Sequence, residues 1–230
     1  MSGWLFPSAI VTPDVHVRQA VRTPAYNGCH MYRLSYVLTA LVLSVAPAAA
    51  QTWQIDTAHS RAQFTVRHLL ISDIRGDFGA VSGTVDYDGK DLTKAKINAT
   101  IDVKSISTRV DKRDEHLKTD DFLDVANHPT MTFVSKSITP GANGRYNMTG
   151  DLTIRGTTKT VTFELTPPLG PIATRGQTKI GASASGKINR KDFGVKYHEV
   201  MDNGGLAVAD DVFIQLDVEL IQRVPRTSSN

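Results

Sequence analysis

Hydrophobic and polar residues alternate at every second position along most of the chain after Gln54. This spacing is typical of half-buried β-strands, because an α-helix repeats about every 3.6 residues. In the first such run, one face takes Phe64, Val66, His68 and Leu70. Further strand-like runs cover residues 79–87, 96–106, 130–138, 145–154, 159–165, 179–188 and 212–221. The pattern therefore predicts about eight strands.

Several runs have one apolar and one polar face. The clearest apolar faces are Ile97, Ala99, Ile101 and Val103, and Val212, Ile214, Leu216, Val218 and Leu220. Turn pairs such as Asp88-Gly89 and Asn143-Gly144 separate the runs, and no helical crossover joins them. Short connections indicate antiparallel neighbours. The sequence predicts an all-β domain that either closes into an up-and-down barrel or packs as a sandwich.

Residues 111–127 interrupt the strand pattern. Asp111 is placed to cap a short helix that passes through Leu117 and ends before Pro129. We expect this helix to cover one end of the barrel.

Residues 31–50 have the composition of a bacterial secretory signal peptide. Arg33 provides a basic start, an apolar run follows, and three alanines precede Gln51. The apolar run is shorter than the roughly 20 residues that span a bilayer, so we expect no stable membrane insertion. We expect periplasmic localisation and a mature domain of residues 51–230. Because residues 1–30 precede a complete signal, we expect them to be a mis-assigned upstream extension, with Met31 as the true start.

Charge and cysteine content exclude several function classes. Of 26 basic and 23 acidic residues, the first fifty positions hold three and one, which leaves 23 and 22 in the mature part. This near-neutral balance, with no basic cluster, argues against a nucleic-acid partner. The one cysteine, Cys29, precedes the signal's apolar run, so the mature chain has no thiol for a disulfide, a metal or catalysis.

The inward face of an eight-stranded barrel is filled by side chains or surrounds a small ligand. The residues that we expect to line the lumen are Phe64, Val66, Phe78, Ile97, Ala99, Ile101, Phe133, Phe163, Ile180, Ala182 and Ala184. The alanines, together with Gly186, would leave room for a ligand. Alternatively, the small residues only let the strands curve or pack closely.

The polar groups form no catalytic or metal-binding motif in the sequence. The mature histidines are His59, His68, His116, His128 and His198, and none of them has the spacing of a zinc-binding helix. Ser60 follows His59, but neighbouring strand residues point to opposite faces, so His59 is badly placed to activate it. We therefore expect no catalytic residue, no metal site and no cofactor other than a bound lipid or quinone.

Five stretches together resemble the YceI family of exported, lipocalin-like polyisoprenoid binders. They are Trp53-Gln54-Ile55-Asp56 with His59-Ser60; Phe64-x-Val66-x-His68 with Gly76-Asp77-Phe78; Thr108 with Arg113-Asp114-Glu115-His116-Leu117 and Asp121-Phe122; Gly150-Asp151-Leu152-Thr153-Ile154-Arg155-Gly156; and Arg190-Lys191-Asp192-Phe193-Gly194. The resemblance implies an eight-stranded lipocalin-like barrel with a helix over one opening. It also implies a lumen for an isoprenoid or similar long-chain amphiphile, and a homodimer.

Three functional hypotheses follow from these residues and the resemblance. The first is a periplasmic protein that carries, stores or senses an isoprenoid lipid, ubiquinone-like or polyprenyl phosphate-like, with its head group near His68, Arg113, Asp114 and His116. Arg113 and Asp114 could instead hold the helix to the barrel. The second is a lipid hydrolase or isomerase with His68 and His116 as acid and base. The third is a stress-response or adhesion protein whose barrel is solidly packed with phenylalanines.

Overall fold

A computed structural model describes residues 51–202 and 204–223, so the predicted extension and signal peptide lie outside the described residues. The described chain forms one sheet with the strands β1 (Gln51–Ile55), β2 (Arg61–His68), β3 (Ser72–Phe78), β4 (Val81–Tyr87), β5 (Lys96–Asp102), β6 (Ile106–Ser107), β7 (Thr130–Pro140), β8 (Tyr146–Ile154), β9 (Thr157–Leu165), β10 (Leu169–Thr174), β11 (Gln177–Asn189) and β12 (Val208–Arg223). The helical segments are α1 (Asp111–Lys118) and the 3-10 turns η1 (Leu92–Lys94), η2 (Val103–Ser105), η3 (Ala142–Gly144) and η4 (Arg190–Phe193). Within this part of the chain, no helix is long and apolar enough to cross a membrane.

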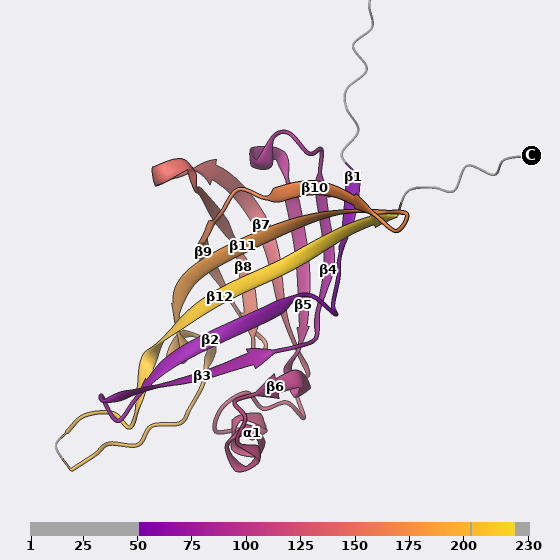
Figure 1. Ribbon diagram of the computed structural model, residues 1–230. Helices are drawn as coiled ribbons and strands as arrows, with labels where there is room; N and C mark the ends of the chain where they lie inside the picture. The colour runs from indigo at the N-terminus through magenta and orange to yellow at the C-terminus, as the bar shows by residue number, and fades with distance from the viewer. Residues whose placement is uncertain (1–50, 203, 224–230) are drawn as a thin grey trace, which may run out of the picture. The chain divides into compact units, whose positions relative to one another are not determined.

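Eight strands close into an antiparallel barrel. The order is β11, β9, β8, β7, β5, β4, β1 and β12, and β12 pairs again with β11 along the whole length of β11. Figure 1 shows the two long strands β11 and β12 side by side across the front of the barrel. The predicted eight-stranded all-β barrel is therefore confirmed, and the sandwich alternative is wrong because the sheet has no open edge between β11 and β12.

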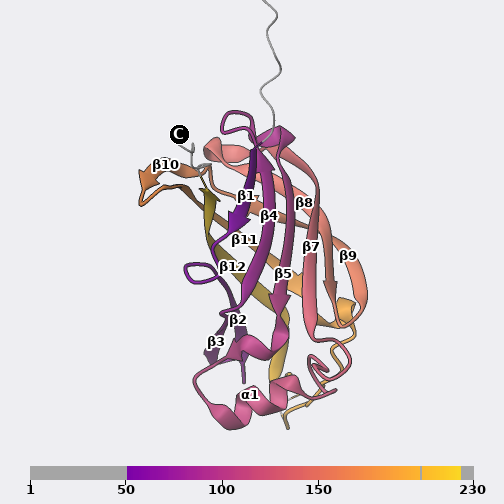
Figure 2. The same cartoon turned by 90° about the vertical axis from the view of Figure 1, so that its right-hand side faces the viewer.

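The strands β1 and β2 lie end to end along one edge of β12. β1 pairs with the C-terminal part of β12 at Ile221, whereas β2 pairs with the preceding part from Val208 to Asp217. β3 continues the sheet beyond β2, and β6 pairs with the end of β3. The helix α1 lies at this same end of the barrel, as Figure 2 shows, which confirms the predicted helix over one end.

Alternation along the strands separates the core from the outer surface. The buried core includes Val85 of β4, Phe133 of β7, Phe163 of β9 and Ile180 of β11, and it continues through the barrel as one cluster. The outward residues of the same strands pair across the sheet surface, as in the hydroxyl contact between Thr149 and Thr162.

Some details of the predicted elements are wrong. Leu70 does not continue the apolar face of β2, because β2 ends at His68 and Leu70 lies exposed in the following turn. Asp111 is the first helical residue and not the cap, since the capping position is Val110, which makes no side-chain hydrogen bond. The predicted strand 96–106 breaks after Asp102, whose carboxylate accepts a hydrogen bond from the N–H of Lys104 at the start of η2.

Candidate functional site

The barrel encloses two adjoining cavities of about 270 and 160 Å³. The smaller, inner cavity lies between the barrel strands, and the larger, outer cavity lies at the end covered by α1. The two share six lining residues: Phe64, Phe78, Met131, Ile154, Ile188 and Ile214. We treat them as one lumen, and we call its α1 end the mouth. Together they fall in the range of about 300–1,000 Å³ that is usual for ligand sites.

The inner cavity is almost wholly apolar. All the predicted lumen residues except Val66 line it: Phe64, Phe78, Ile97, Ala99, Ile101, Phe133, Phe163, Ile180, Ala182 and Ala184. Val66 lines the outer cavity. The barrel is therefore hollow, which argues against the hypothesis of a solidly packed interior.

The outer cavity ends in cationic and aromatic groups. Its polar lining consists of His68, Arg113, His116, Arg190 and Tyr197, and no carboxylate from the described residues lines it. Three of the four predicted head-group residues thus meet at the mouth. The fourth, Asp114, lies outside the lining.

Asp114 and Arg113 hold the start of α1 against Thr108, the residue that follows β6. The buried carboxylate of Asp114 accepts hydrogen bonds from the N–H of Thr108, at 2.8 Å, and from the hydroxyl of Thr108. The guanidinium of Arg113 donates from Nε to that hydroxyl oxygen, at 2.7 Å, and from Nη2 to the Thr108 carbonyl, at 2.9 Å. These bonds support the alternative role of holding the helix, while Arg113 still presents a face to the cavity.

His116 lies in an aromatic cluster on one side of the mouth. Its ring makes edge contacts with Phe122 and Tyr197, whose rings stack on each other with 4.6 Å between their centroids. Its Nε2 lies 3.0 Å from a carboxylate oxygen of Asp121. The pKa of Tyr197 is raised, chiefly because its hydroxyl donates a hydrogen bond to Glu199. The ring of His116 is thus held in place, whereas the imidazole of His68 has no hydrogen-bond partner among the described residues.

Arg190 is the most deeply buried charge at the mouth, and sequence reasoning did not single it out. Its side chain is 7% exposed and donates to the carbonyls of Tyr197, Val208 and Ala209 and to the carboxylate of Asp210, over 2.7–3.2 Å. Burial lowers the pKa of Arg190, and Asp210 opposes that shift. An arginine keeps its charge under such conditions. Arg190 therefore joins the loop at Tyr197 to the start of β12 at the mouth.

The apolar and aromatic residues of the mouth that were not among the predicted site residues include Phe122, Phe193 and Tyr197. They lie in loops and in η4, where no period-two pattern can assign a face. The only sequence signal for Phe193 was its place in the Arg190-Lys191-Asp192-Phe193-Gly194 motif.

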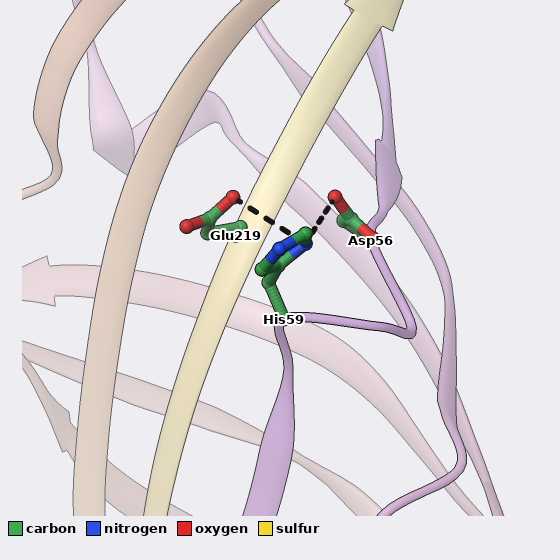
Figure 3. A group of neighbouring side chains, drawn as sticks. All are labelled: Asp56, His59 and Glu219. Atoms are coloured by element: carbon green, nitrogen blue, oxygen red, sulfur yellow. Dashed lines mark hydrogen bonds and ion pairs between the residues drawn. The ribbon is translucent and has the colours of Figure 1, made fainter.

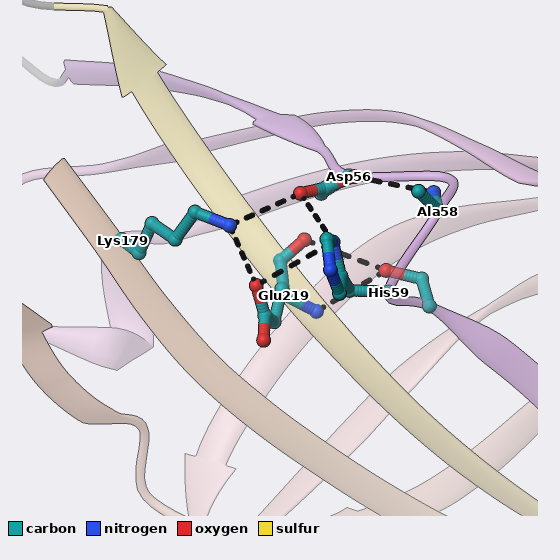
Figure 4. A network of polar contacts seen from close by, with 6 residues as sticks. Asp56, Ala58, His59, Lys179 and Glu219 are labelled. Atoms are coloured by element: carbon teal, nitrogen blue, oxygen red, sulfur yellow. Dashed lines mark hydrogen bonds and ion pairs between the residues drawn. The ribbon is translucent and has the colours of Figure 1, made fainter. Parts of the chain in front are cut away.

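A second polar cluster lies outside the lumen, at the bend between β1 and β2. Asp56, His59 and Glu219 converge there, with His59 Nδ1 2.9 Å from Asp56 and 4.0 Å from Glu219 (Figure 3). The ammonium of Lys179 lies 3.3 Å from Asp56 and 2.9 Å from Glu219 (Figure 4). Because Lys179 already supplies a cation to both carboxylates, we interpret the cluster as an ion-pair network. His59 and Lys179 lower the pKa of Asp56, and the two carboxylates raise the pKa of Lys179.

Ser60 joins this network to the barrel. Its side chain is buried, accepting from the Glu219 N–H at 3.1 Å and donating to the Glu219 carbonyl at 3.4 Å. The hydroxyl thus fixes the bend to β12.

The closed sheet and its lumen define a hollow antiparallel barrel with an apolar interior and a cationic mouth. The chain belongs to the YceI-like domain family, whose model matches residues 53–220. A UPF0312 protein of Staphylococcus epidermidis is 33% identical over 168 residues, which is 73% of this chain and 95% of the relative. A UPF0312 protein of Staphylococcus aureus is 33% identical over 165 residues, with 71% and 94% coverage.

Solved structures of other proteins have the same fold. BcnA of Burkholderia cenocepacia is 27% identical with a TM-score of 0.59, over 72% of this chain and 98% of BcnA. The YCEI protein of Campylobacter jejuni is 32% identical with a TM-score of 0.58, over 69% of this chain and 90% of that protein. A polyisoprenoid-binding domain from Saccharophagus degradans matches with a TM-score of 0.53 over 75% of this chain and 98% of that domain, but at 12% identity it shows the fold alone.

Proposed function

We propose that this protein is a periplasmic binding protein that holds an isoprenoid lipid or a similar long-chain amphiphile in its lumen. The apolar chain lies in the inner cavity, and the polar head group lies at the mouth. The observation that carries this proposal is the chemical gradient along the lumen. The inner cavity is lined almost only by apolar side chains, and the outer cavity ends in two arginines, two histidines and a tyrosine.

Burial of the chain supplies the binding energy in this proposal. Each buried CH₂ contributes about 0.8 kcal/mol, so a few isoprene units exceed the costs of ordering both chain and lumen. The head group is held by hydrogen bonds from Arg113, His68 and His116. These donors suit a quinone carbonyl or a phosphate oxygen. The polyisoprenoid-binding domain of Saccharophagus degradans, named for its ligand, adds an analogy with the same fold.

The test is extraction of the purified protein with organic solvent, followed by mass spectrometry of the extract. We expect a lipid with an isoprenoid or long alkyl chain. The comparison is with Ala182→Phe, a variant that places a ring in the inner cavity. This variant should fold but carry no lipid. The proposal fails if wild-type preparations repeatedly hold no lipid and take up no added ubiquinone. It fails equally if the Ala182→Phe variant carries as much lipid as the wild type.

The periplasmic location and the oligomeric state are further parts of this proposal. Export predicts a mature protein that begins at Gln51 in a periplasmic extract, which mass spectrometry of the intact protein measures. The family resemblance predicts a homodimer, which size-exclusion chromatography with light scattering measures.

The alternative of a lipid hydrolase or isomerase has one supporting observation. His68 and His116 line the same cavity, and His116 lies beside the carboxylate of Asp121. An enzyme of this kind should convert a long-chain ester or an isomerisable polyene, and the His68→Ala and His116→Ala variants should lose that conversion. A wild-type protein that retains such compounds unchanged supports the binding role.

A further inference from the structure

Three phenylalanines of the lumen each lie against a glycine on a neighbouring strand. Phe64 of β2 lies over Gly76 of β3, and a Cβ atom added to Gly76 would lie 2.5 Å from the Phe64 ring. The same construction gives 2.5 Å between Gly150 of β8 and the Phe133 ring of β7. It gives 2.6 Å between Gly186 of β11 and the Phe163 ring of β9. Such distances are far shorter than the roughly 3.5–4.0 Å of carbon atoms in contact, so no side chain fits beneath these rings.

A left-handed backbone does not explain these glycines, although at Gly150 the added Cβ would also lie 2.5 Å from the backbone carbonyl oxygen of Val134. None of the three has a left-handed φ, so alanine could adopt the same backbone conformation. Gly181, on the same strand as Gly186, is a useful contrast. It also lacks a left-handed φ, but a Cβ added there meets nothing within 4 Å. At Gly186 it is therefore the ring that requires glycine.

Each glycine lets a ring lie back against the barrel wall. Phe133 and Phe163 both line the inner cavity, and their rings meet edge to face with 5.7 Å between centroids. A methyl group on Gly186 would push the Phe163 ring away from the wall, toward the cavity and toward Phe133. Because the inner cavity is only about 160 Å³, a displacement of this kind removes a large part of its width.

We propose that Gly186, together with Gly150 and Gly76, sets the girth of the lumen, so that it admits a methyl-branched chain and not only a straight one. The proposal rests on the proposed lipid-binding function. It adds that these glycines determine which chain shape the lumen accepts. Straight chains are narrower, so they should tolerate the loss of width better than isoprenoid chains do.

The test compares two alcohols of equal main-chain length by isothermal titration calorimetry. All-trans-farnesol carries methyl branches, and dodecan-1-ol does not. Gly186→Ala should weaken farnesol binding about tenfold and dodecan-1-ol binding much less, since one methylene in an apolar pocket is worth about 10- to 200-fold in selectivity. Gly181→Ala, the matched control on the same strand, should leave both affinities unchanged. Gly186→Ala with Phe163→Leu should recover farnesol binding, because the leucine vacates the space that the new methyl group needs.

The outcomes separate this proposal from the function on which it rests. If the wild-type protein binds neither alcohol, the proposed lipid-binding function is wrong. The width of the lumen then has no bound chain to select. The wild-type protein could bind both alcohols while Gly186→Ala weakens neither affinity, or weakens both equally. Either result would overturn the role of the glycine and leave the lipid-binding function intact. If Gly186→Ala does not fold, Phe163→Leu alone still decides. It should raise the preference for farnesol over dodecan-1-ol, and an unchanged preference contradicts the proposal.

Discussion

The two ends of the lumen are closed by different kinds of contact. The connection between β4 and β5 lies at the end opposite α1 (Figure 1), and its buried residues Leu92 and Ala95 line the inner cavity. At the mouth, arginines bind backbone carbonyls of distant segments. Arg190 binds three carbonyls of the segment 197–209, and Arg155 binds those of Asp120 and Phe122.

This difference determines how each end responds to mutation. Apolar contact is non-directional and is distributed over many atoms, so loss of one side chain weakens the whole domain by a moderate amount. A buried arginine satisfies several carbonyls at once, and each carbonyl left without a partner costs about 1–3 kcal/mol. Few residues therefore hold the mouth, and one substitution can release a whole segment.

The largest effect is expected for Arg190→Ala. The substitution removes the donor to three carbonyls and leaves the Asp210 carboxylate with Lys191 as its remaining partner, and we expect a loss of about 3 kcal/mol in the free energy of unfolding. Urea denaturation measures this loss. Limited proteolysis should also cut the segment 197–210 earlier than in the wild type.

The control for Arg190→Ala is Lys187→Ala. Lys187 pairs with Asp211 at 2.7 Å, but both side chains are about half exposed, so we expect a loss of no more than about 0.5 kcal/mol. Similar losses for the two variants would mean that burial of the arginine does not matter and that the mouth is not held as we describe.

The opposite end should respond through global stability alone. Leu92 is 8% exposed in η1, and Leu92→Ala should cost about 2 kcal/mol because a cavity remains in the apolar cover. Proteolysis of the segment 197–210 should not change beyond the effect of lower stability. Leu169→Ala is the control, since Leu169 is 78% exposed and should give a change below about 0.5 kcal/mol. A local loosening at the mouth in Leu92→Ala would contradict the separation of the two ends.

The bend at Asp56 lies where β1, at the closed end, gives way to β2, which leads to the mouth. Folding lowers the pKa of Asp56 below its usual 3.8, first because of His59 and then because of Lys179. A carboxylate with a lowered pKa stabilises the fold above its unfolded pKa, and this contribution disappears as the pH falls through the folded pKa. Asp56→Asn should therefore cost about 1 kcal/mol at neutral pH, and its difference from the wild type should shrink below about pH 3.8.

Denaturation of both proteins across the pH range measures this difference. Asp211→Asn removes one carboxylate of the exposed Lys187 pair and should have a smaller effect at neutral pH. A cost of Asp56→Asn that stays constant down to the lowest pH would show that the carboxylate charge is not what fixes the bend.

The sequence predicts the lumen far better than it predicts the mouth. Alternation assigns each residue of a predicted strand to a face, and every predicted lumen residue lines a cavity. Phe78 is the exception to this route, because it lies in β3, which was not among the predicted strands. The short barrel strand β1 was also not among the predicted strands. β3 escaped prediction because Asp73, Arg75 and Asp77 dominate its composition, and β10 because it contains Gly170-Pro171.

At the mouth, the helical residues Arg113 and His116 were found, but Arg190 was not. Its partners are carbonyl oxygens near Tyr197 and Val208, and every residue type offers a carbonyl. Which carbonyls meet a given arginine depends on the path of the loops, which has no period in sequence. The contacts between arginine side chains and backbone carbonyls at the mouth are for this reason the part of the fold that is hardest to predict from sequence.

Individual turns at the two ends differ as well, and one such difference carries the smallest expected effect. At the closed end, Gly89 and Gly144 take left-handed positions, with φ of 78° and 72°, and Asn143 takes one with φ 53°. The turn between β2 and β3, beside the mouth, instead has leucines at such positions, and Leu70 has φ 65° and is 58% exposed. A left-handed leucine is strained by roughly 1–2 kcal/mol, and replacing it with glycine removes this strain. Glycine also makes the unfolded chain more flexible, which lowers the stability of the fold by about 0.5–1 kcal/mol.

Leu70→Gly should therefore stabilise the protein by about 0.5 kcal/mol, although it removes an apolar side chain. Ile71 is the adjacent control. It is 80% exposed and has no left-handed φ, so Ile71→Gly should destabilise by about 0.5–1 kcal/mol. Thermal unfolding of the two variants measures both changes. Opposite signs at these two neighbouring, exposed positions follow only if backbone conformation governs the stability of this turn. A loss of stability in both variants would instead mean that the leucine contributes packing at the mouth.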